Sequence, residues 1–280
     1  MAEPQSVIAL IGPGAMGEAI IAGLLREAVT LPDHILAAGP RPERGLELKT
    51  RYGIQVFSDN LSAARLADVV ILAVKPQKLQ RVLAGLKGQI QPSALVLSIV
   101  AGASIQTLQD GLDHATVVRA MPNTPAQIGA GITVWTASPS TSPEQVELAR
   151  QILCALGQEI YVEEENYLDM ATALSGTGPA YVFLFMEALI DAGVHLGFPR
   201  RIAEQLVVQT LIGTVDYYRS RKVHPAALRN EVTSPGGTSA AALYYLDKAG
   251  FRTAISRAIW AAYERSQELG KGKGEGQAPE

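Results

Sequence analysis

Apolar residues follow two different patterns along the chain, and the change between them falls close to residue 164. In the first part, short apolar runs with almost no alternation are separated by stretches that have helical spacing. The runs cover residues 7–11, 34–38, 54–57, 68–74, 94–100, 115–122 and 130–137. Uninterrupted apolar strands are typical of a parallel sheet that helices cover on both faces. This pattern predicts a doubly wound α/β domain over residues 1–164.

In the second part of the chain, apolar residues recur with helical spacing from residue 166 to residue 269, without a convincing strand. We predict an all-helical domain over residues 165–270, with about six helices. Residues 182–196 and 206–218 are apolar around much of the helix circumference, so we expect them to be buried against another subunit. The tail, residues 271–280, combines glycine with charge and is predicted to be disordered.

Composition disfavours several classes of protein but does not identify one. The net charge of −3 makes a nucleic acid a poor partner. Apolar runs fall short of the roughly 20 residues that cross a bilayer, and the first residues lack the features of a signal peptide. We therefore expect a cytoplasmic protein with no membrane partner. The single cysteine, Cys154, lies in an apolar helical stretch, and we predict that it is buried rather than a nucleophile.

Glycines at positions 12, 14 and 17 stand between the first apolar run and the first helical stretch, in "IALIGPGAMGEAI". Gly12 would permit a tight turn, Gly14 would let a pyrophosphate approach the backbone, and Gly17 would let helix and strand pack closely. The helix start would offer unpaired N–H groups to the phosphates. The alternative is a strand-to-helix bend that uses glycine for geometry alone. With further strands following, we predict a Rossmann-like dinucleotide site.

The end of the second predicted strand bears on the choice between NAD and NADP. An NAD enzyme usually has Asp or Glu there to accept hydrogen bonds from the ribose 2′-hydroxyl. No acid lies between Leu36 and Pro42, whereas Arg41 and Arg44 could face a 2′-phosphate. The alternative for each is a solvated arginine on a surface loop. We predict NADPH as the cofactor, with NADH as the alternative.

Four further motifs accompany the glycine turn. They are "AVKPQ" (73–77), "RAMPNTP" (119–125), "ALSGTGPAYVF" (173–183) and "VTSPGGTSAAAL" (232–243). Together these motifs closely resemble the Δ1-pyrroline-5-carboxylate reductases, the last enzymes of proline synthesis, and the likeness extends from residue 7 to about residue 269. The resemblance implies reduction of a cyclic imine by hydride transfer from NAD(P)H. It also implies a helical dimerisation domain, with dimers that assemble into decamers and active sites built from two chains.

The resemblance assigns cofactor contacts motif by motif. The glycine turn would contribute through its backbone, Asn60 would lie near the adenosine ribose, and the residues after the fourth strand would line the crevice. Ala101 and Gly102 would leave room for the nicotinamide, with Asn123 and Thr124 close to its ring. The full set of expected cofactor residues is Gly12, Gly14, Ala15, Met16, Gly17, Arg41, Asn60, Ala73, Val74, Lys75, Pro76, Ala101, Gly102, Asn123 and Thr124.

The segment "TSPGGTS" (233–239) is the expected substrate site. Taken alone, Ser234 is a good N-cap and Pro235 suits a first helical position, so a capped helix start is the alternative reading. The resemblance implies instead that backbone N–H groups bind the substrate carboxylate. The expected substrate residues are Ser234, Gly236, Gly237, Thr238, Ser239 and Glu165. Thr238 and Ser239 are the expected catalytic residues, and Ser239 stands where the family usually has threonine.

Other chemistry is not favoured. His34, His114, His195 and His224 lie outside the motifs, so we predict surface or interface positions for them and no metal site. A β-hydroxyacid-type dehydrogenase is the alternative enzyme, but it would carry a catalytic lysine in the second part, and residues 166–198 contain no lysine. A third hypothesis is a protein that binds NADP without catalysis, which the intact "SPGGT" turn disfavours.

Overall fold

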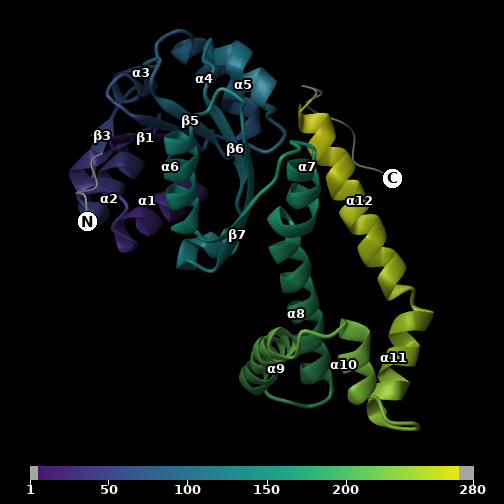
Figure 1. Ribbon diagram of the computed structural model, residues 1–280. Helices are drawn as coiled ribbons and strands as arrows, with labels where there is room; N and C mark the ends of the chain where they lie inside the picture. Colours follow the sequence, from purple (N-terminus) through teal and green to yellow (C-terminus); the bar gives the residue numbers. More distant parts are fainter. Residues whose placement is uncertain (1–5, 271–280) are drawn as a thin grey trace. The chain divides into compact units, whose positions relative to one another are not determined.

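The computed structural model describes residues 6–270, and these residues divide into two compact units. The first unit contains the chain up to Thr177 together with the segment from Ala262 onward, and the second contains Gly178–Ala261. Figure 1 shows a sheet with helices in the first unit and helices alone in the second. The boundary predicted between residues 164 and 165 stays a prediction. The predicted disordered tail lies outside the described residues.

The first unit is built on one eight-stranded sheet with the strand order β3-β2-β1-β4-β5-β6-β7-β8. All neighbouring strands are parallel except β6 and β7, which are antiparallel. The chain moves outward from β1 in both directions, as in a Rossmann-like sheet, so the predicted fold class is confirmed. The strands are β1 Ile8–Ile11, β2 Ile35–Ala38, β3 Gln55–Phe57, β4 Val69–Leu72, β5 Leu95–Ser98, β6 Val117–Met121, β7 Gly131–Ala137 and β8 Gly157–Tyr161.

Helices cover both faces of this sheet, which explains why its central strands are apolar throughout. Ile8 and Leu10 of β1 point into one buried cluster, and Ala9 and Ile11 point into the other. The first cluster includes residues of α1 Ala15–Arg26, α2 Pro42–Tyr52 and α6 Pro143–Cys154. The second includes residues of α3 Asn60–Ala64, α4 Pro76–Leu86 and α5 Ile105–Leu112.

The far edge of the sheet departs from the prediction. β7 runs antiparallel to β6 because only a short segment with a 3₁₀ turn at Thr124–Ile128 joins them, and a parallel pair needs a longer crossover. β8 was not predicted. It is an edge strand that pairs with β7 on one side, and Gln158 and Glu159 make its sequence half polar.

Two predictions of burial are wrong. Cys154 is exposed because it ends α6 on the polar row that also carries Glu147, Arg150 and Gln151. His114, predicted at a surface or interface, is buried, and its Nε2 lies 2.8 Å from the Ala94 carbonyl oxygen. A hydrogen bond to that carbonyl lets the ring be buried between the strands' ends.

Six α-helices follow the sheet in the described chain, as predicted. They are α7 Tyr167–Ala171, α8 Gly178–His195, α9 Arg200–Arg221, α10 Pro225–Glu231, α11 Thr238–Lys248 and α12 Phe251–Gly270. A π-helical turn, Thr172–Gly176, separates α7 from α8, and the Thr177 N–H donates to the Thr172 carbonyl. Pro179 then lies in the first turn of α8, where its missing N–H costs nothing. The π-helical turn, and not the proline, therefore separates the two α-helices.

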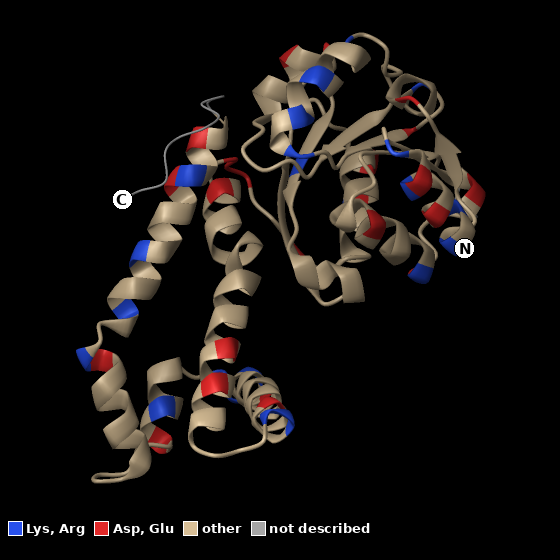
Figure 2. Ribbon diagram, turned by 180° about the vertical axis from the view of Figure 1, so that it is seen from behind, with Lys and Arg blue, Asp and Glu red and all other residues tan. Residues whose placement is uncertain are grey.

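The second unit has almost no core of its own. Ala203 is its one buried residue among those described, and it packs against Gly193 where α8 and α9 meet. Large apolar side chains of α8 are exposed instead, including Val182, Phe183, Leu184, Phe185 and Leu189. Figure 2 shows few charged residues along α8. So wide an exposed apolar surface is typical of a subunit interface.

The stretch Tyr167–His195 also has the length and composition to cross a membrane, and 6% of its most apolar window is buried. The prediction that no apolar run approaches this length is therefore wrong for this segment. Glu187 and Asp191 interrupt its apolar surface within α8. The same exposed surface is what a helix buried between two subunits would present.

We expect substitution of an exposed leucine of α8 to disrupt self-association. Leu184 is 68% exposed in the single chain, so Leu184→Arg should cost the free chain little. A charge buried at an interface without a partner should weaken association at least about 100-fold. Analytical ultracentrifugation checks this, with Leu46→Arg on α2 (66% exposed) as the matched control. Unchanged association of both Leu184→Arg and Ile212→Arg on α9 would contradict an interface along these helices.

Candidate active site

The three glycines of the first turn have three different surroundings. Gly12 has φ +89°, and a Cβ there would lie 2.6 Å from Val74 Cγ1. At Gly17 a Cβ would lie 2.8 Å from Leu10 Cδ2, which shows how closely α1 packs on β1. At Gly14 a Cβ would meet nothing within 4 Å. Gly12 and Gly17 are therefore required by the fold, whereas the space beside Gly14 is open to a ligand.

The start of α1 provides donors at this open space. The first α-helical bond runs from the Glu18 N–H to the Gly14 carbonyl at 2.8 Å. The N–H groups of Ala15, Met16 and Gly17 precede this bond, so they have no acceptor within the helix. Unpaired N–H groups and the positive end of the helix dipole suit a pyrophosphate. The residues present therefore fit the phosphates of a dinucleotide.

A network of charged side chains supports the glycine turn. Arg44 Nε donates to the Pro13 carbonyl at 3.2 Å, and its Nη2 donates to Glu18 Oε2. Glu18 Oε1 also accepts hydrogen bonds from Arg51 Nη1 at 2.5 Å and from the Tyr52 hydroxyl at 2.9 Å. Burial raises the pKa of the Glu18 carboxyl, but the hydrogen bonds from Arg44 and Tyr52 lower it more, so the pKa lies below its ordinary value.

This network changes the interpretation of the two arginines after β2. Arg44 was a candidate for the 2′-phosphate, but Pro13, Glu18 and Glu47 take its donors. The structure therefore places Arg44 as a support of the glycine turn. Arg41 is exposed at the N-cap of α2, and its role toward the cofactor stays a prediction.

A cavity of about 610 Å³ opens directly beside the glycine turn. Gly12, Asn60 and Val74 line it, as expected for the adenosine side of a dinucleotide site. The sequence reading did not include Ser58, Lys78 and Arg81, which line it as well. The spacing of Lys78 and Arg81 on one face of α4 was the signal that could have found them. Ala73 is half-buried at the end of β4, Lys75 is exposed at the N-cap of α4, and Pro76 begins that helix.

Most of the residues expected near the nicotinamide already contact other residues of the protein. Gly102 has φ +75°, and a Cβ there would lie 2.7 Å from the Gly270 nitrogen. The end of α12 thus occupies the space beside Gly102 where the nicotinamide ring was predicted. Ala101 is half-buried. Asn123 Oδ1 accepts the Ile132 N–H at 2.9 Å, and Thr124 is exposed beside it.

Glu165, a candidate for substrate binding, belongs to an ion-pair network. Its Oε1 accepts hydrogen bonds from Arg119 Nη1 and from the Ile105 N–H, both at 2.8 Å. Arg119, whose side chain is 6% exposed, also donates to Asp169 Oδ1 at 2.9 Å. Asp169 in turn accepts the Ser266 hydroxyl. These contacts fix the starts of α5 and α7 and the end of α12, which is a structural use for Glu165.

The "SPGG" segment is a tight turn rather than a helix cap. The Gly237 N–H donates to the Ser234 carbonyl at 3.0 Å, and Gly236 has φ +72°. Pro followed by Gly with positive φ is typical of a type II turn. The alternative of a helix capped by Ser234 is therefore wrong, because α11 begins at Thr238 with Gly237 as its N-cap. The Gly237 N–H, expected to bind substrate, is already used by the turn.

The start of α11 nevertheless leaves donors exposed. The Ala241 N–H makes the first bond, to the Gly237 carbonyl at 3.2 Å. The N–H groups of Thr238, Ser239 and Ala240 precede it and have no acceptor within the helix. The hydroxyls of Thr238 and Ser239 lie together on the first turn of α11. One helix end thus offers N–H donors and hydroxyl groups to a small anion.

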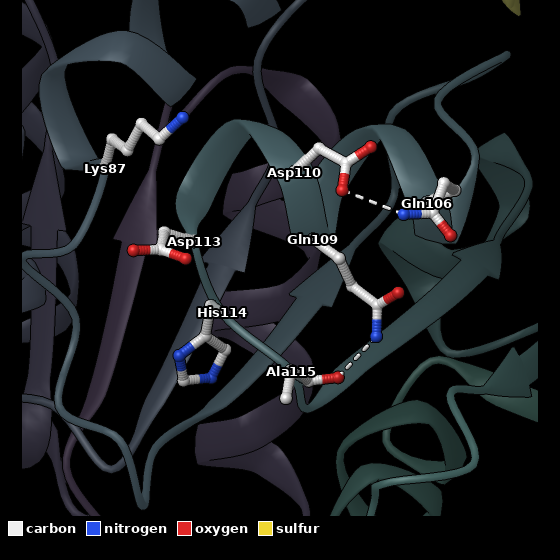
Figure 3. Close-up of a pocket in the computed structure, with 7 residues that line it drawn as sticks. All are labelled: Lys87, Gln106, Gln109, Asp110, Asp113, His114 and Ala115. Atoms are coloured by element: carbon white, nitrogen blue, oxygen red, sulfur yellow. Dashed lines mark hydrogen bonds between the residues drawn. The ribbon is translucent and has the colours of Figure 1, made fainter.

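A second pocket lies at the amino-terminal ends of the strands, opposite the carboxyl ends that carry the glycine turn. Figure 3 shows Lys87, Gln106, Gln109, Asp110, Asp113, His114 and Ala115 around a cavity of about 620 Å³. These residues precede β6, on the edge of the sheet away from the carboxyl ends where α/β proteins bind ligands. In the described part of the chain, His, Cys, Asp and Glu form no group that could hold a metal ion.

Comparison with known proteins decides the family. Residues 165–269 match the family model described as pyrroline-5-carboxylate reductase dimerisation, and residues 7–102 match one described as NADP oxidoreductase coenzyme F420-dependent. A pyrroline-5-carboxylate reductase of Synechocystis sp. is 46% identical over 264 residues, which cover 94% of this chain and 98% of that protein. The chain belongs to the pyrroline-5-carboxylate reductase family.

Solved structures of this family agree with the fold described above. The pyrroline carboxylate reductase of Plasmodium falciparum, solved with NADP bound, has a TM-score of 0.88 and 31% identity, and covers 96% of this chain and 100% of that one. The Coxiella burnetii pyrroline-5-carboxylate reductase has a TM-score of 0.84 and 36% identity, with coverage of 94% and 98%. The resemblance inferred from the five motifs is confirmed, and the β-hydroxyacid alternative is not favoured.

The contrast between Gly12 and Gly14 leads to a test of the cofactor site. We expect Gly14→Val to fold normally, because a Cβ there meets open space, and to weaken NADPH binding at least about 100-fold by steric clash. Gly12→Ala should instead destabilise the fold, because it adds strain at positive φ and a contact with Val74. Fluorescence titration with NADPH and thermal unfolding separate the two effects. Normal NADPH affinity of Gly14→Val would contradict the assignment.

The lowered pKa of Glu18 leads to a pH-dependent prediction. Glu18→Gln should reduce the free energy of unfolding by about 1–2 kcal/mol at neutral pH, because it removes a charge-assisted pair that is largely shielded from solvent. A carboxyl whose folded pKa is lowered stabilises the protein above its unfolded pKa, ordinarily 4.5, and loses that effect as pH falls through the folded pKa.

The difference between wild type and Glu18→Gln should therefore shrink on acidification below about pH 4. Urea unfolding at neutral and acidic pH measures it. Glu43→Gln on the first turn of α2 is the matched control and should change stability by less than about 0.5 kcal/mol. A difference that grows as the pH falls would contradict the pairing.

Proposed function

We propose that the protein reduces Δ1-pyrroline-5-carboxylate to proline with NADPH, an oxidoreductase acting on a C=N bond. The observation that carries the cofactor half is the open space at Gly14 in front of the unpaired N–H groups of α1. Family membership and the turn at Ser234–Gly237 support the substrate half. The motifs that carry both halves lie within the matched part of the chain.

The start of α11 is the proposed substrate site. The substrate carries one carboxylate, which several N–H groups at a helix start can bind without an arginine. The N–H groups of Gly236, Thr238 and Ser239 would share this charge. The hydroxyl oxygen of Ser239, or that of Thr238, would then accept a hydrogen bond from the protonated ring nitrogen and hold the imine in one orientation.

The chemistry asks little of side chains. When bound, the reduced nicotinamide supplies a hydride to the carbon of the protonated C=N bond. The protein's contribution is to hold the two rings in contact and to exclude water. A general acid is not required where the imine is already protonated in solution. This agrees with the placement of the histidines, since His114 is bonded to the backbone of the sheet and His224 caps α10.

The assembly follows from the second unit. Its exposed apolar helices and the match to a dimerisation family indicate self-association. We infer that two chains bury these helices against each other, that each active site takes residues from both chains, and that dimers assemble into a decamer. We further infer a cytoplasmic enzyme, with neither nucleic acid nor membrane as a partner.

The decisive experiment follows NADPH oxidation with and without pyrroline-5-carboxylate, beside NADH. We expect imine-dependent turnover and a preference for NADPH. In Ser239→Ala, kcat should fall about 10- to 100-fold, because a hydrogen bond to the reacting imine is lost. NADPH affinity should stay within about twofold. Ser220→Ala on α9, whose hydroxyl donates to the Tyr217 carbonyl, is the matched control.

The outcomes separate the parts of the proposal. NADPH binding without imine-dependent oxidation would overturn the substrate assignment and favour a protein that binds NADP without catalysis. An unchanged kcat in Ser239→Ala would remove the role of that hydroxyl while leaving the reaction in place.

A further inference from the structure

The cavity beside the glycine turn has an apolar wall and a charged rim. Leu61, Val74, Val82 and Leu86 contribute apolar surface, which suits the flat ring of a base. Two cations on α4, Lys78 and Arg81, line the same cavity. They are three residues apart on one helix, so their side chains leave the same face. An apolar wall beside two cations suits a nucleoside that carries a phosphate.

The charge of these two cations is not neutralised within the described chain. Lys78 and Arg81 make no ion pair with any residue that the structure describes. Asp59 is the one acid in the cavity lining, and its Oδ1 accepts the Ser62 N–H at 2.8 Å as the N-cap of α3. The lining therefore carries an excess of one positive charge.

The cations that follow β2 cannot by themselves neutralise the charge of a 2′-phosphate. Arg44 is committed to Glu18 and to the Pro13 carbonyl. Arg41 is left as the single cation of that loop, whose residues 39–42 contain no acid to accept a ribose 2′-hydroxyl. A phosphate monoester carries about −1.5 to −2 charges at neutral pH. One exposed arginine would leave much of that charge unpaired.

We propose that Lys78 and Arg81 bind the adenosine 2′-phosphate and set the preference of this enzyme for the phosphorylated dinucleotide. The two side chains meet the phosphate from α4, and Arg41 meets it from the start of α2. The inference rests on the cofactor part of the proposed function and is independent of the imine substrate. The competing roles for these cations are contact with the adenine ring, which would not depend on the 2′-phosphate, and simple solvation.

Two nucleotides that differ only in the 2′-phosphate provide the test. Calorimetry measures binding of adenosine 2′,5′-bisphosphate and adenosine 5′-monophosphate to the full-length wild type, Lys78→Gln, Arg81→Gln and the double variant. Each single variant should weaken binding of the bisphosphate about 10-fold, and the double variant about 50- to 100-fold, as expected for charge-assisted hydrogen bonds. Binding of the monophosphate should change by less than about twofold.

Lys87→Gln, at the C-cap of the same helix and outside this cavity, is the matched control and should leave both affinities unchanged. As a second readout, the double variant should raise KM for NADPH and leave KM for NADH and kcat nearly constant. Equal weakening of both nucleotides would overturn the inference in favour of adenine contact, and unchanged binding would overturn it in favour of solvation. Binding is read without imine, so failure of the substrate assignment would not affect this result.

Discussion

The close approach of α1 to β1 is the constraint on which the cofactor site depends. The helix can start next to the strand only because Gly12 adopts a positive φ against Val74 and Gly17 lies against Leu10. That start aims unpaired N–H groups at the open space beside Gly14. A bulkier residue at Gly12 or Gly17 would shift the helix and with it the donors. Packing and ligand binding thus depend on the same few atoms.

Charged groups near this turn divide into those that support the fold and those that remain for a ligand. Glu18 accepts hydrogen bonds from Arg44, Arg51 and Tyr52 beside the turn, and Arg119 of β6 pairs with two carboxylates. Such networks hold loops in one geometry because a buried charge that loses its partner is costly. The cations of the open cavity have no such partner among the described residues. A site for an anionic cofactor requires this separation of paired from unpaired charge.

The second unit poses a different physical problem. Helices of this length need a packed apolar face to be stable, and the single chain buries almost none of that face in this unit. A second copy of the chain could supply the missing surface at once, since a symmetric interface uses the same patch twice. The turn proposed to bind substrate lies in this unit. Formation of the active site would therefore be coupled to assembly.

The sequence by itself determined the sheet-and-helix alternation, the six later helices, the family and the place of the glycine turn. These features depend on local periodicity and on backbone conformations that favour one residue type. Gly12, with its positive φ, is an example. The sequence did not determine which side chains form hydrogen bonds or ion pairs with residues far away in the chain. Arg44 and Arg41 look alike in sequence, but Glu18 and Pro13, far away in the chain, engage only Arg44.

The same reason accounts for the other errors. Cys154 lies on an amphipathic helix whose buried row is set by packing on the sheet, and β8 is strand because β7 provides a partner for its half-polar sequence. Ser234 is in a turn because its carbonyl meets the Gly237 N–H. Local sequence specifies which backbone shapes are accessible, whereas burial and hydrogen-bond partners come from segments that only the tertiary structure brings together.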